Sequence, residues 1–325
     1  MNEKARVCLA GMLLAGTIGA AWAQEFPQRP VRLVIPLAPG GGADVLVRAF
    51  STRLGDRWGK AVIIDNRAGG DSTIGVNAVA KSAPDGYTLV LIYSIHAVHP
   101  SIKHNLPYDI VKDFAPVVNL AEAPSVVVAN PALPVSSIRE LVALAKERPG
   151  KITFAGSGTG GSSHLAGELF NTYAGTRMLH VPYKGAGPAL TDVIGGHVDL
   201  IFATMLAGMP HARSGKLRAL AVTGKTRSAL LPNVPTIIES GLKDYEFATW
   251  YGLLAPAGTP RPTLDKIHSD VAAVIRTSEV TQVYANQGAQ VSGDGPDQFA
   301  AYIKTEIDKW ARVAQEAKIP VEDIK

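Results

Sequence analysis

The sequence predicts an α/β protein of two lobes, and three observations support this fold class. Short runs rich in β-branched residues alternate with longer segments whose apolar residues recur at helical spacing. The alternation starts after residue 30 and restarts near residue 125. Two further extended segments, 114–124 and 248–258, lie where the chain is expected to cross between the lobes. The first lobe is then discontinuous and completed by the C-terminal helices.

The first half of the chain contains three expected strands, at residues 32–37, 62–64 and 88–93. Expected helices at 44–57 and 75–82 separate them. Strands that alternate with helices in this way predict a parallel sheet with helices on both faces.

The second half repeats the pattern, beginning with a strand at 125–129 and a helix at 136–148. Ser136 or Ser137 is expected to cap that helix, with Glu140 in its first turn. The remaining expected strands are 152–155, 179–182, 200–203 and 217–222, and the remaining helices are 163–173, 188–194, 264–277 and 297–317. We place the first lobe at residues 24–122 and 249–325, and the second at 123–248.

The N-terminus has the layout of a secretory signal peptide. Lys4 and Arg6 precede an apolar run at 7–20, and Ala21-Trp22-Ala23 supplies small residues at the two positions that a signal peptidase reads. The run is shorter than the ~20 residues that a membrane-spanning helix needs. We therefore predict export, with residues 1–23 removed by cleavage before Gln24.

The charge balance argues against nucleic-acid binding. The chain carries 32 basic and 28 acidic residues, a net charge of +4. The basic residues are scattered and have no interleaved aromatic residues, unlike a nucleic-acid-binding surface. A mildly positive protein is compatible with an anionic ligand.

A glycine-rich loop at residues 36–44 follows the first expected strand and opens a helix. In open α/β sheets, ligands bind at this end of the strands. Three successive glycines, Gly40 to Gly42, allow the backbone to approach a ligand closely, and the helix N-terminus offers unpaired N–H groups. Such a loop suits a carboxylate or phosphate. Asp44 as a plain helix cap is compatible with the same prediction.

A second loop, at residues 156–164, has the same setting in the second lobe. Ser157, Thr159, Ser162 and Ser163 add hydroxyl groups to its backbone amides, which predicts a second anion-binding loop. The alternative for Ser162 or Ser163 is a plain helix cap. A third glycine-bearing loop, at 66–75, carries Arg67, which we expect to be a structural or solvent-facing charge.

Motifs for catalysis, cofactors and metals are weak. The second loop matches neither the G-x-S-x-G nucleophile turn nor the phosphate-binding P-loop. We predict no cofactor and no metal site: His164 and Glu168 lack a second histidine, and His96, His99 and His104 lie in what reads as a polar loop. The alternative function is an exported α/β hydrolase that pairs Ser157 or Ser162 with His164.

Motifs along nearly the whole mature chain resemble the Bug family, also called the TctC-type receptors of tripartite tricarboxylate transporters. The stretches that carry the resemblance are 26–36 (FPQRPVRLVIP), 40–44 (GGGAD), 66–69 (NRAG), 83–89 (APDGYTL), 106–109 (LPYD), 112–117 (KDFAPV), 181–185 (VPYKG), 195–199 (GGHVD), 215–221 (GKLRALA), 232–236 (PNVPT) and 255–260 (APAGTP).

The resemblance implies a type II periplasmic binding protein fold, with two Rossmann-like lobes joined by two crossing strands. It implies a non-enzymatic, monomeric periplasmic receptor that captures a small carboxylate and passes it to membrane subunits of a tripartite tricarboxylate transporter or to a sensor kinase. By the same analogy the ligand-binding residues are Leu37, Ala38, Gly41, Gly42, Ala43, Asp44, Ser94, Ser157, Gly158, Thr159, Gly160, Ser162, His164, Tyr183 and Ala203.

Three departures from the family pattern bear on the ligand. Leu37 stands where members often have Phe, and Asp71 lies in a loop that usually has no acidic residue. Asp71 is expected to repel a carboxylate unless it points away or meets a cation. Ala203 stands where members commonly have an Asp, and an acidic side chain at that position is able to pair with a ligand ammonium. If that position lines the cleft, we expect a non-amino acid: an aliphatic di- or tricarboxylate, or an aromatic acid.

Overall fold

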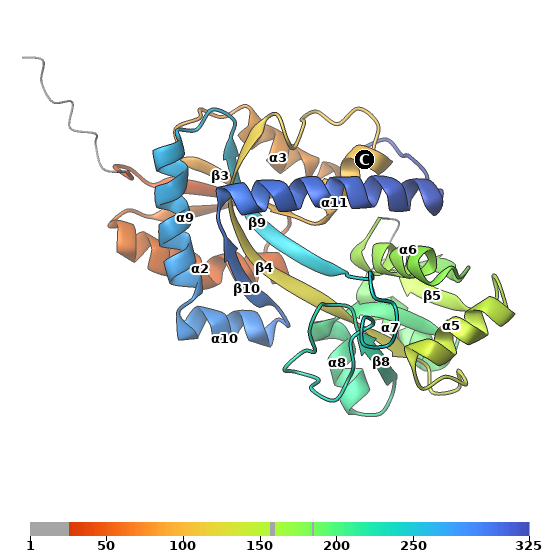
Figure 1. Ribbon diagram of the computed structural model, residues 1–325. Coiled ribbons are helices and arrows are strands. Elements are labelled where there is room, and N and C mark those ends of the chain that lie inside the picture. Colours follow the sequence, from red (N-terminus) through yellow and green to blue (C-terminus); the bar gives the residue numbers. More distant parts are fainter. Residues whose placement is uncertain (1–25, 157–159, 184, 325) are drawn as a thin grey trace, which may run out of the picture.

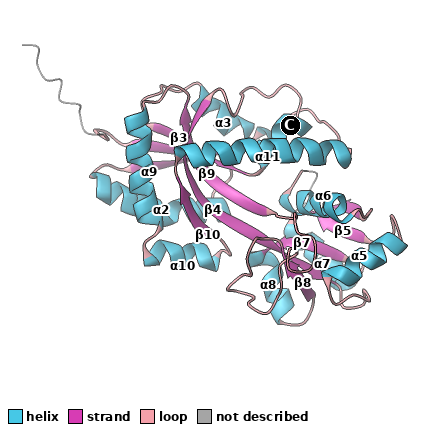
Figure 2. Cartoon of the chain, viewed as in Figure 1, coloured by secondary structure: helices cyan, strands magenta, loops and turns pink. Residues whose placement is uncertain are grey.

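The computed structural model describes residues 26–156, 160–183 and 185–324 and has two lobes joined by one continuous sheet (Figure 1). Within these residues the sheet has ten strands, in the order β2-β1-β3-β9-β4-β7-β5-β6, with β8 and β10 also paired to β4. Helices flank the strands of both lobes on each side (Figure 2). This arrangement confirms the predicted α/β class.

Lobe 1 begins with three parallel strands. Strands β1 and β3 are largely buried because both faces of the sheet are covered there, while β2, at the end of the strand order, is only partly buried. The elements are β1 (Val31–Ile35), α2 (Gly42–Trp58), β2 (Val62–Asn66), the short 3₁₀ turn η1 (Gly70–Ser72), α3 (Thr73–Ala80), β3 (Thr88–Tyr93) and α4 (Ile95–Ile102). Helix α4 was not predicted. Its Pro100 and three nearby histidines suggested a polar loop, but Ala97, Val98 and Ile102 pack it into the core.

Two long strands cross between the lobes, as predicted. Strand β4 (Phe114–Ala129) pairs with β9 (Ala248–Pro256) in antiparallel register, from Phe114 opposite Pro256 to Pro124 opposite Ala248. The segment 125–129, expected to be a separate strand, is the end of β4 and pairs with β7 and β8 of lobe 2. The sheet is therefore mixed rather than wholly parallel. The residues at which one lobe ends and the other begins stay a prediction.

Lobe 2 repeats the strand–helix alternation. Its elements are α5 (Ile138–Glu147), β5 (Thr153–Gly156), α6 (Ser162–Ala174), β6 (Leu179–Pro182), α7 (Ala186–Gly195), β7 (Leu200–Thr204), α8 (Met205–Arg213) and β8 (Arg218–Val222). The predicted cap of α5 is confirmed: Ser137 Oγ accepts from the Glu140 N–H at 3.3 Å, and Glu140 Oε2 accepts from the Ser136 N–H at 2.6 Å. These bonds satisfy two N–H groups at the helix start.

The C-terminal segment returns to lobe 1 through α9 (Arg261–Ile275), α10 (Ser278–Asn286), β10 (Gln290–Asp294) and α11 (Pro296–Glu316). Helix α11 extends past the crossing strands to lie beside α6 (Figure 1). The buried carboxylate of Glu306 accepts hydrogen bonds from the indole N–H groups of Trp250 and Trp310, each at 3.1 Å. Arg312 donates to the Tyr173 hydroxyl at 3.0 Å and so ties α11 to lobe 2.

A single large hydrophobic cluster runs through both lobes. It includes Val90 of β3, Phe154 and Phe202 of lobe 2, and Trp250 and Phe299 near the crossing strands. Two smaller clusters fill the opposite faces of the two lobes. In the described part of the chain, no helix is both long enough and apolar enough to span a membrane.

Asp270 joins helices α2 and α9, and its removal is a test of lobe 1 packing. The carboxylate, 1% exposed as a residue, accepts from Trp58 Nε1 and Arg57 Nε at 2.7 Å and from Lys266 Nζ at 2.8 Å. We expect Asp270→Asn to lower the free energy of unfolding by about 2 kcal/mol at neutral pH, because hydrogen bonds to a charged group are lost. Urea denaturation measures this difference.

The same test has a pH signature. Burial acts to raise the pKa of Asp270, but hydrogen bonds from Lys266, Arg57 and Trp58 outweigh it and hold the pKa below the usual 3.8. The ionised group therefore stabilises the fold above that pH, and its contribution is lost as pH falls through the folded-state pKa. The control is Asp265→Asn, which breaks only an exposed pair with Arg261. An equal effect of both variants would refute the prediction.

Candidate functional site

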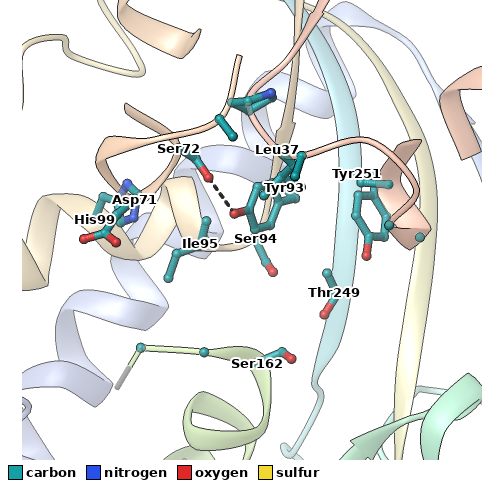
Figure 3. Close-up of a pocket in the computed structure, with 18 of the residues that line it drawn as sticks. Leu37, Asp71, Ser72, Tyr93, Ser94, Ile95, His99, Ser162, Thr249 and Tyr251 are labelled. Atoms are coloured by element: carbon teal, nitrogen blue, oxygen red, sulfur yellow. Dashed lines mark hydrogen bonds between the residues drawn. The ribbon is translucent and has the colours of Figure 1, made fainter. Parts of the chain in front are cut away.

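A cavity of about 930 Å³ opens between the two lobes (Figure 3). Lobe 1 contributes the loops that follow β1, β2 and β3, together with part of α4. Lobe 2 contributes the start of α6 and the residue before α8, and β9 supplies Thr249 and Tyr251. The carboxyl ends of strands from both lobes therefore face one shared space.

Five helices begin at this cavity. Their N-cap residues are Gly41 for α2, Ser72 for α3, Ser94 for α4, Gly161 for α6 and Thr204 for α8, and all five line the cavity. No cap side chain among these five bonds to its own helix. The first N–H groups of a helix have no partner within it, and each N-terminus carries about half a positive charge. The cavity is therefore suited to an anion.

The first loop is held by the carboxylate of Asp44, which is 3% exposed. It accepts from the Gly40 N–H at 3.0 Å, from Arg48 Nε at 2.8 Å and from Asn66 Nδ2 at 3.1 Å. The hydrogen bond from Arg48 holds the pKa of Asp44 below its usual value, against the effect of burial. Asp44 does not cap the helix as considered from the sequence, because Gly41 occupies that position. It instead anchors the loop from inside the first turn.

The first loop lines the cavity with Leu37, Ala38, Gly41, Gly42, Ala43 and Asp44, all named from the sequence, and with Pro36 and Pro39. Their role in ligand binding stays a prediction. Gly41 has extended backbone angles, and a Cβ atom placed on it meets nothing within 4 Å. The space in front of this glycine is therefore open for a ligand.

The second loop reaches the cavity through Gly160, Gly161 and Ser162. The expected cap role of Ser162 or Ser163 is wrong, since α6 begins after Gly161 and both serines lie inside its first turn. Gly160 has a φ of +76°, a left-handed conformation that favours glycine. Ser157, Gly158 and Thr159 lie outside the described residues.

His164 is buried behind this loop and does not line the cavity. Its Nδ1 accepts from the Gly160 N–H at 3.0 Å, and its Nε2 lies 3.7 Å from Glu168 Oε1. Burial and the neighbouring His180 lower the pKa of His164 to about 3, so the ring is neutral. Its position holds the loop and leaves neither nitrogen directed at Ser162 as a catalytic base.

Two other residues named from the sequence lie away from the cavity. The Tyr183 hydroxyl donates to Asp192 Oδ2 at 2.7 Å and its ring packs on the lobe 2 core. Ala203 is 1% exposed and faces that core, while the next residue, Thr204, lines the cavity. Because side chains alternate along a strand, position 203 points to the opposite face. Ala203 therefore does not disfavour an amino-acid ligand, because it does not line the cavity.

Aromatic residues of the cavity wall were not predicted, although Ser94 beside them was. Tyr93, at the end of β3, and Tyr251, on β9, have ring centroids 6.4 Å apart at an interplanar angle of 29°. The Tyr93 hydroxyl lies 2.8 Å from Ser72 Oγ, and burial raises the pKa of Tyr251 to about 12. Both tyrosines therefore line the cavity with neutral phenol side chains. For Tyr93, its place at the end of an expected strand was the available signal, whereas Tyr251 lies inside β9.

The histidines of the expected polar loop lie instead on or beside α4. His96 and His99 are 0% and 1% exposed, and burial lowers their pKa values to about 3 and about 4. Across the described residues, no three potential metal-ligating His, Cys, Asp or Glu side chains come together. His99 lines the cavity as a neutral ring.

Asp71, the acidic residue that departs from the family pattern, is paired with a cation. Asp71 Oδ2 accepts from Lys103 Nζ at 2.7 Å, and the same Nζ lies 3.7 Å from Glu322 Oε2. Arg67 has the structural role expected of it, since its Nε donates to Asp65 Oδ2 at 2.7 Å. The charge of Asp71 is therefore matched within the protein.

Comparison with known proteins identifies the family. The profile of the tripartite tricarboxylate transporter family receptor, TctC, matches residues 46–319. The chain belongs to this family. It is 37% identical to Protein BugT of Bordetella pertussis over 320 residues, which cover 97% of this chain and 98% of that protein.

Two solved structures show the same fold. A protein of R. palustris solved with adipate is 35% identical, with a TM-score of 0.76 over 91% of this chain and 99% of that one. MatC from Rhodopseudomonas palustris with bound malate is 30% identical, with a TM-score of 0.72 over 89% of this chain and 99% of that one. The predicted Bug/TctC membership and the two-lobed binding-protein fold are confirmed.

Family membership also decides between receptor and enzyme. TctC-family proteins are periplasmic substrate-binding proteins, so this chain is a receptor and not a hydrolase. The position of His164 agrees, because its Nδ1 is already occupied by the Gly160 N–H. The expected signal peptide and the cleavage before Gln24 lie in residues 1–25, outside the described part of the chain.

The Asp44 network is expected to set the order of the first loop. We predict that Asp44→Ala speeds amide exchange at Gly40 by about tenfold or more, because it removes the acceptor that holds this N–H. Hydrogen–deuterium exchange with mass spectrometry measures it. Asp56→Ala, an exposed change near the far end of the same helix, is the control. Unchanged exchange in residues 38–43 of Asp44→Ala would show that the carboxylate does not order the loop.

Proposed function

We propose that this TctC-family receptor captures one small carboxylate between its lobes and delivers it to a tripartite tricarboxylate-type transporter or to a sensor. The observation that carries the proposal is the convergence of five helix N-termini, none capped by its own side chain, on one cavity. Main-chain N–H groups and helix dipoles bind an anion without a charged side chain.

The proposed carboxylate site lies between the two glycine-bearing loops. The amides of Gly41, Gly42 and Ala43 face the ligand from lobe 1, and the start of α6 at Ser162 faces it from lobe 2. The Gly160 N–H is already bonded to His164, so Gly160 contributes close approach of its backbone rather than a donor. Ser157, Gly158 and Thr159 stay in the proposal by family analogy.

Solved relatives support the ligand class. TctC-type proteins that share 35% and 30% identity with this chain are titled with adipate and with malate, both carboxylates. The delivery step follows the family description of a transporter receptor. Uptake of a radiolabelled carboxylate by cells with and without this chain tests delivery; equal uptake would exclude a transport role.

Binding itself is tested by a thermal-shift screen of mono-, di- and tricarboxylates, followed by calorimetry. A ligand at about 100 times its dissociation constant adds about 2.7 kcal/mol to the free energy of unfolding. We expect at least one acid to raise the melting temperature and its amide analogue to have no effect. A panel in which no acid stabilises the protein would overturn the proposal.

Gly41→Val is expected to abolish binding while the fold survives. Residue 41 has ordinary extended angles and open space beside it, so a valine fits and fills the volume in front of the α2 N-terminus. Calorimetry is expected to show a loss of affinity of at least a hundredfold. The matched control is Gly187→Val in α7, which also meets nothing within 4 Å and lies outside the cavity lining. Retained affinity in Gly41→Val would remove the first loop from the site.

A further inference from the structure

The cavity has very little positive side-chain charge to offer a ligand. Among the described residues that line it, Lys103 is the only one with a cationic side chain. That side chain is 9% exposed and contacts two carboxylates, Asp71 Oδ2 at 2.7 Å and Glu322 Oε2 at 3.7 Å. This ammonium is therefore already paired with carboxylates of the protein itself.

The backbone fixes all three members of this cluster. The Lys103 N–H donates to the His99 carbonyl at 2.9 Å. The Glu322 N–H donates to the Ile102 carbonyl, and the His104 N–H donates to the Glu322 carbonyl, both at 2.9 Å. Asp71 has a left-handed φ of 51° inside the turn that leads into α3. The C-terminal segment and the α3 turn thus bring carboxylates to Lys103 from two directions.

Much of the remaining wall is apolar or aromatic, and hydroxyl groups are added by Ser72, Ser94, Ser162, Thr204 and Thr249. Leu37, Ile95, Ile102 and Leu165 line it together with the rings of Tyr93 and Tyr251. Figure 3 shows Asp71 and His99 on one side of the cavity, Thr249 and Tyr251 on the other, and Ser162 facing them from lobe 2. A ligand body placed among these residues contacts carbon atoms and neutral phenols.

From this arrangement we infer that the cavity selects an aromatic monocarboxylate over a dicarboxylate. The inference rests on the proposed function, because it assigns the single carboxylate to the helix N-termini and the ring to the apolar wall. A second carboxylate at the Lys103 cluster meets a cation already paired with Asp71 and lies near two like charges. Lys103 and Asp71 are therefore specificity-determining residues.

Calorimetry with benzoate and terephthalate tests the inference, because the two acids differ only by a second carboxylate across the same ring. We expect benzoate to bind at least tenfold more tightly. Hexanoate and adipate form the matched aliphatic pair, in which hexanoate is expected to bind more tightly than adipate and less tightly than benzoate.

Asp71→Asn ties the selectivity to the cluster. Asparagine tolerates the left-handed backbone and keeps the size of the side chain, while Lys103 loses the charge of its closest partner. The ratio of benzoate to terephthalate affinity is expected to move at least tenfold toward terephthalate. Glu322→Gln is expected to shift the ratio in the same direction and serves if Asp71→Asn fails to fold. Glu147→Gln, an exposed change on α5, is the control and leaves the ratio unchanged.

The outcomes separate the two proposals. If none of the four acids binds, and no other acid of the screen stabilises the chain, the proposed function fails and this inference with it. If terephthalate binds as tightly as benzoate, or adipate binds more tightly than both, carboxylate capture stands and the selectivity is overturned. An affinity ratio that Asp71→Asn and Glu322→Gln both leave unchanged also overturns it.

Discussion

The need to satisfy the N–H groups at helix starts is the constraint on which the site depends. Helices that follow a strand at the same edge of a sheet begin close together, and here five such starts from both lobes border one cavity. Two of the N-caps, Gly41 and Gly161, are glycines and have no side chain that could accept a hydrogen bond from the first N–H groups of the helix. This geometry suits an anion from solution, as we propose.

The loops that present these amides are themselves held by buried polar side chains. In lobe 1, Asp44 bonds to Gly40 and is balanced by Arg48. In lobe 2, neutral His164 accepts from Gly160 in the same relative position, four residues after the bonded glycine. Each lobe thus uses a side chain of the first helical turn to fix its own loop. A loop that is already ordered loses less conformational entropy when a ligand binds. Strands β4 and β9 then set the two loops opposite each other.

The sequence was sufficient for those parts of the molecule whose cause is local. Strands followed by glycine-rich loops and helices predicted both loops that border the cavity, because the signal lies within about ten residues. Caps were misplaced by one to three residues, since a glycine N-cap leaves no side-chain signature. Helix α4 was missed because Pro100 and the histidines resemble a loop, although its apolar residues meet α11, about 200 positions later. The contact of Lys103 with Asp71 and Glu322 joins segments remote in sequence, so no local pattern announces it.

The electrostatic potential of this cavity has two sources, the peptide dipoles of the helices and the charged side chains. Substitutions affect these two sources differently. The attraction for an anion comes from peptide dipoles, which persist whichever side chains surround them. The Lys103 cluster comes from three side chains, and a single substitution of Asp71 or Glu322 removes one of the carboxylates that pair with Lys103. Without Asp71, Lys103 keeps only the longer contact with Glu322, whereas with both carboxylates it is held as a part of the wall. A family with one backbone scaffold can thus retain carboxylate capture while the far wall determines which group accompanies the carboxylate.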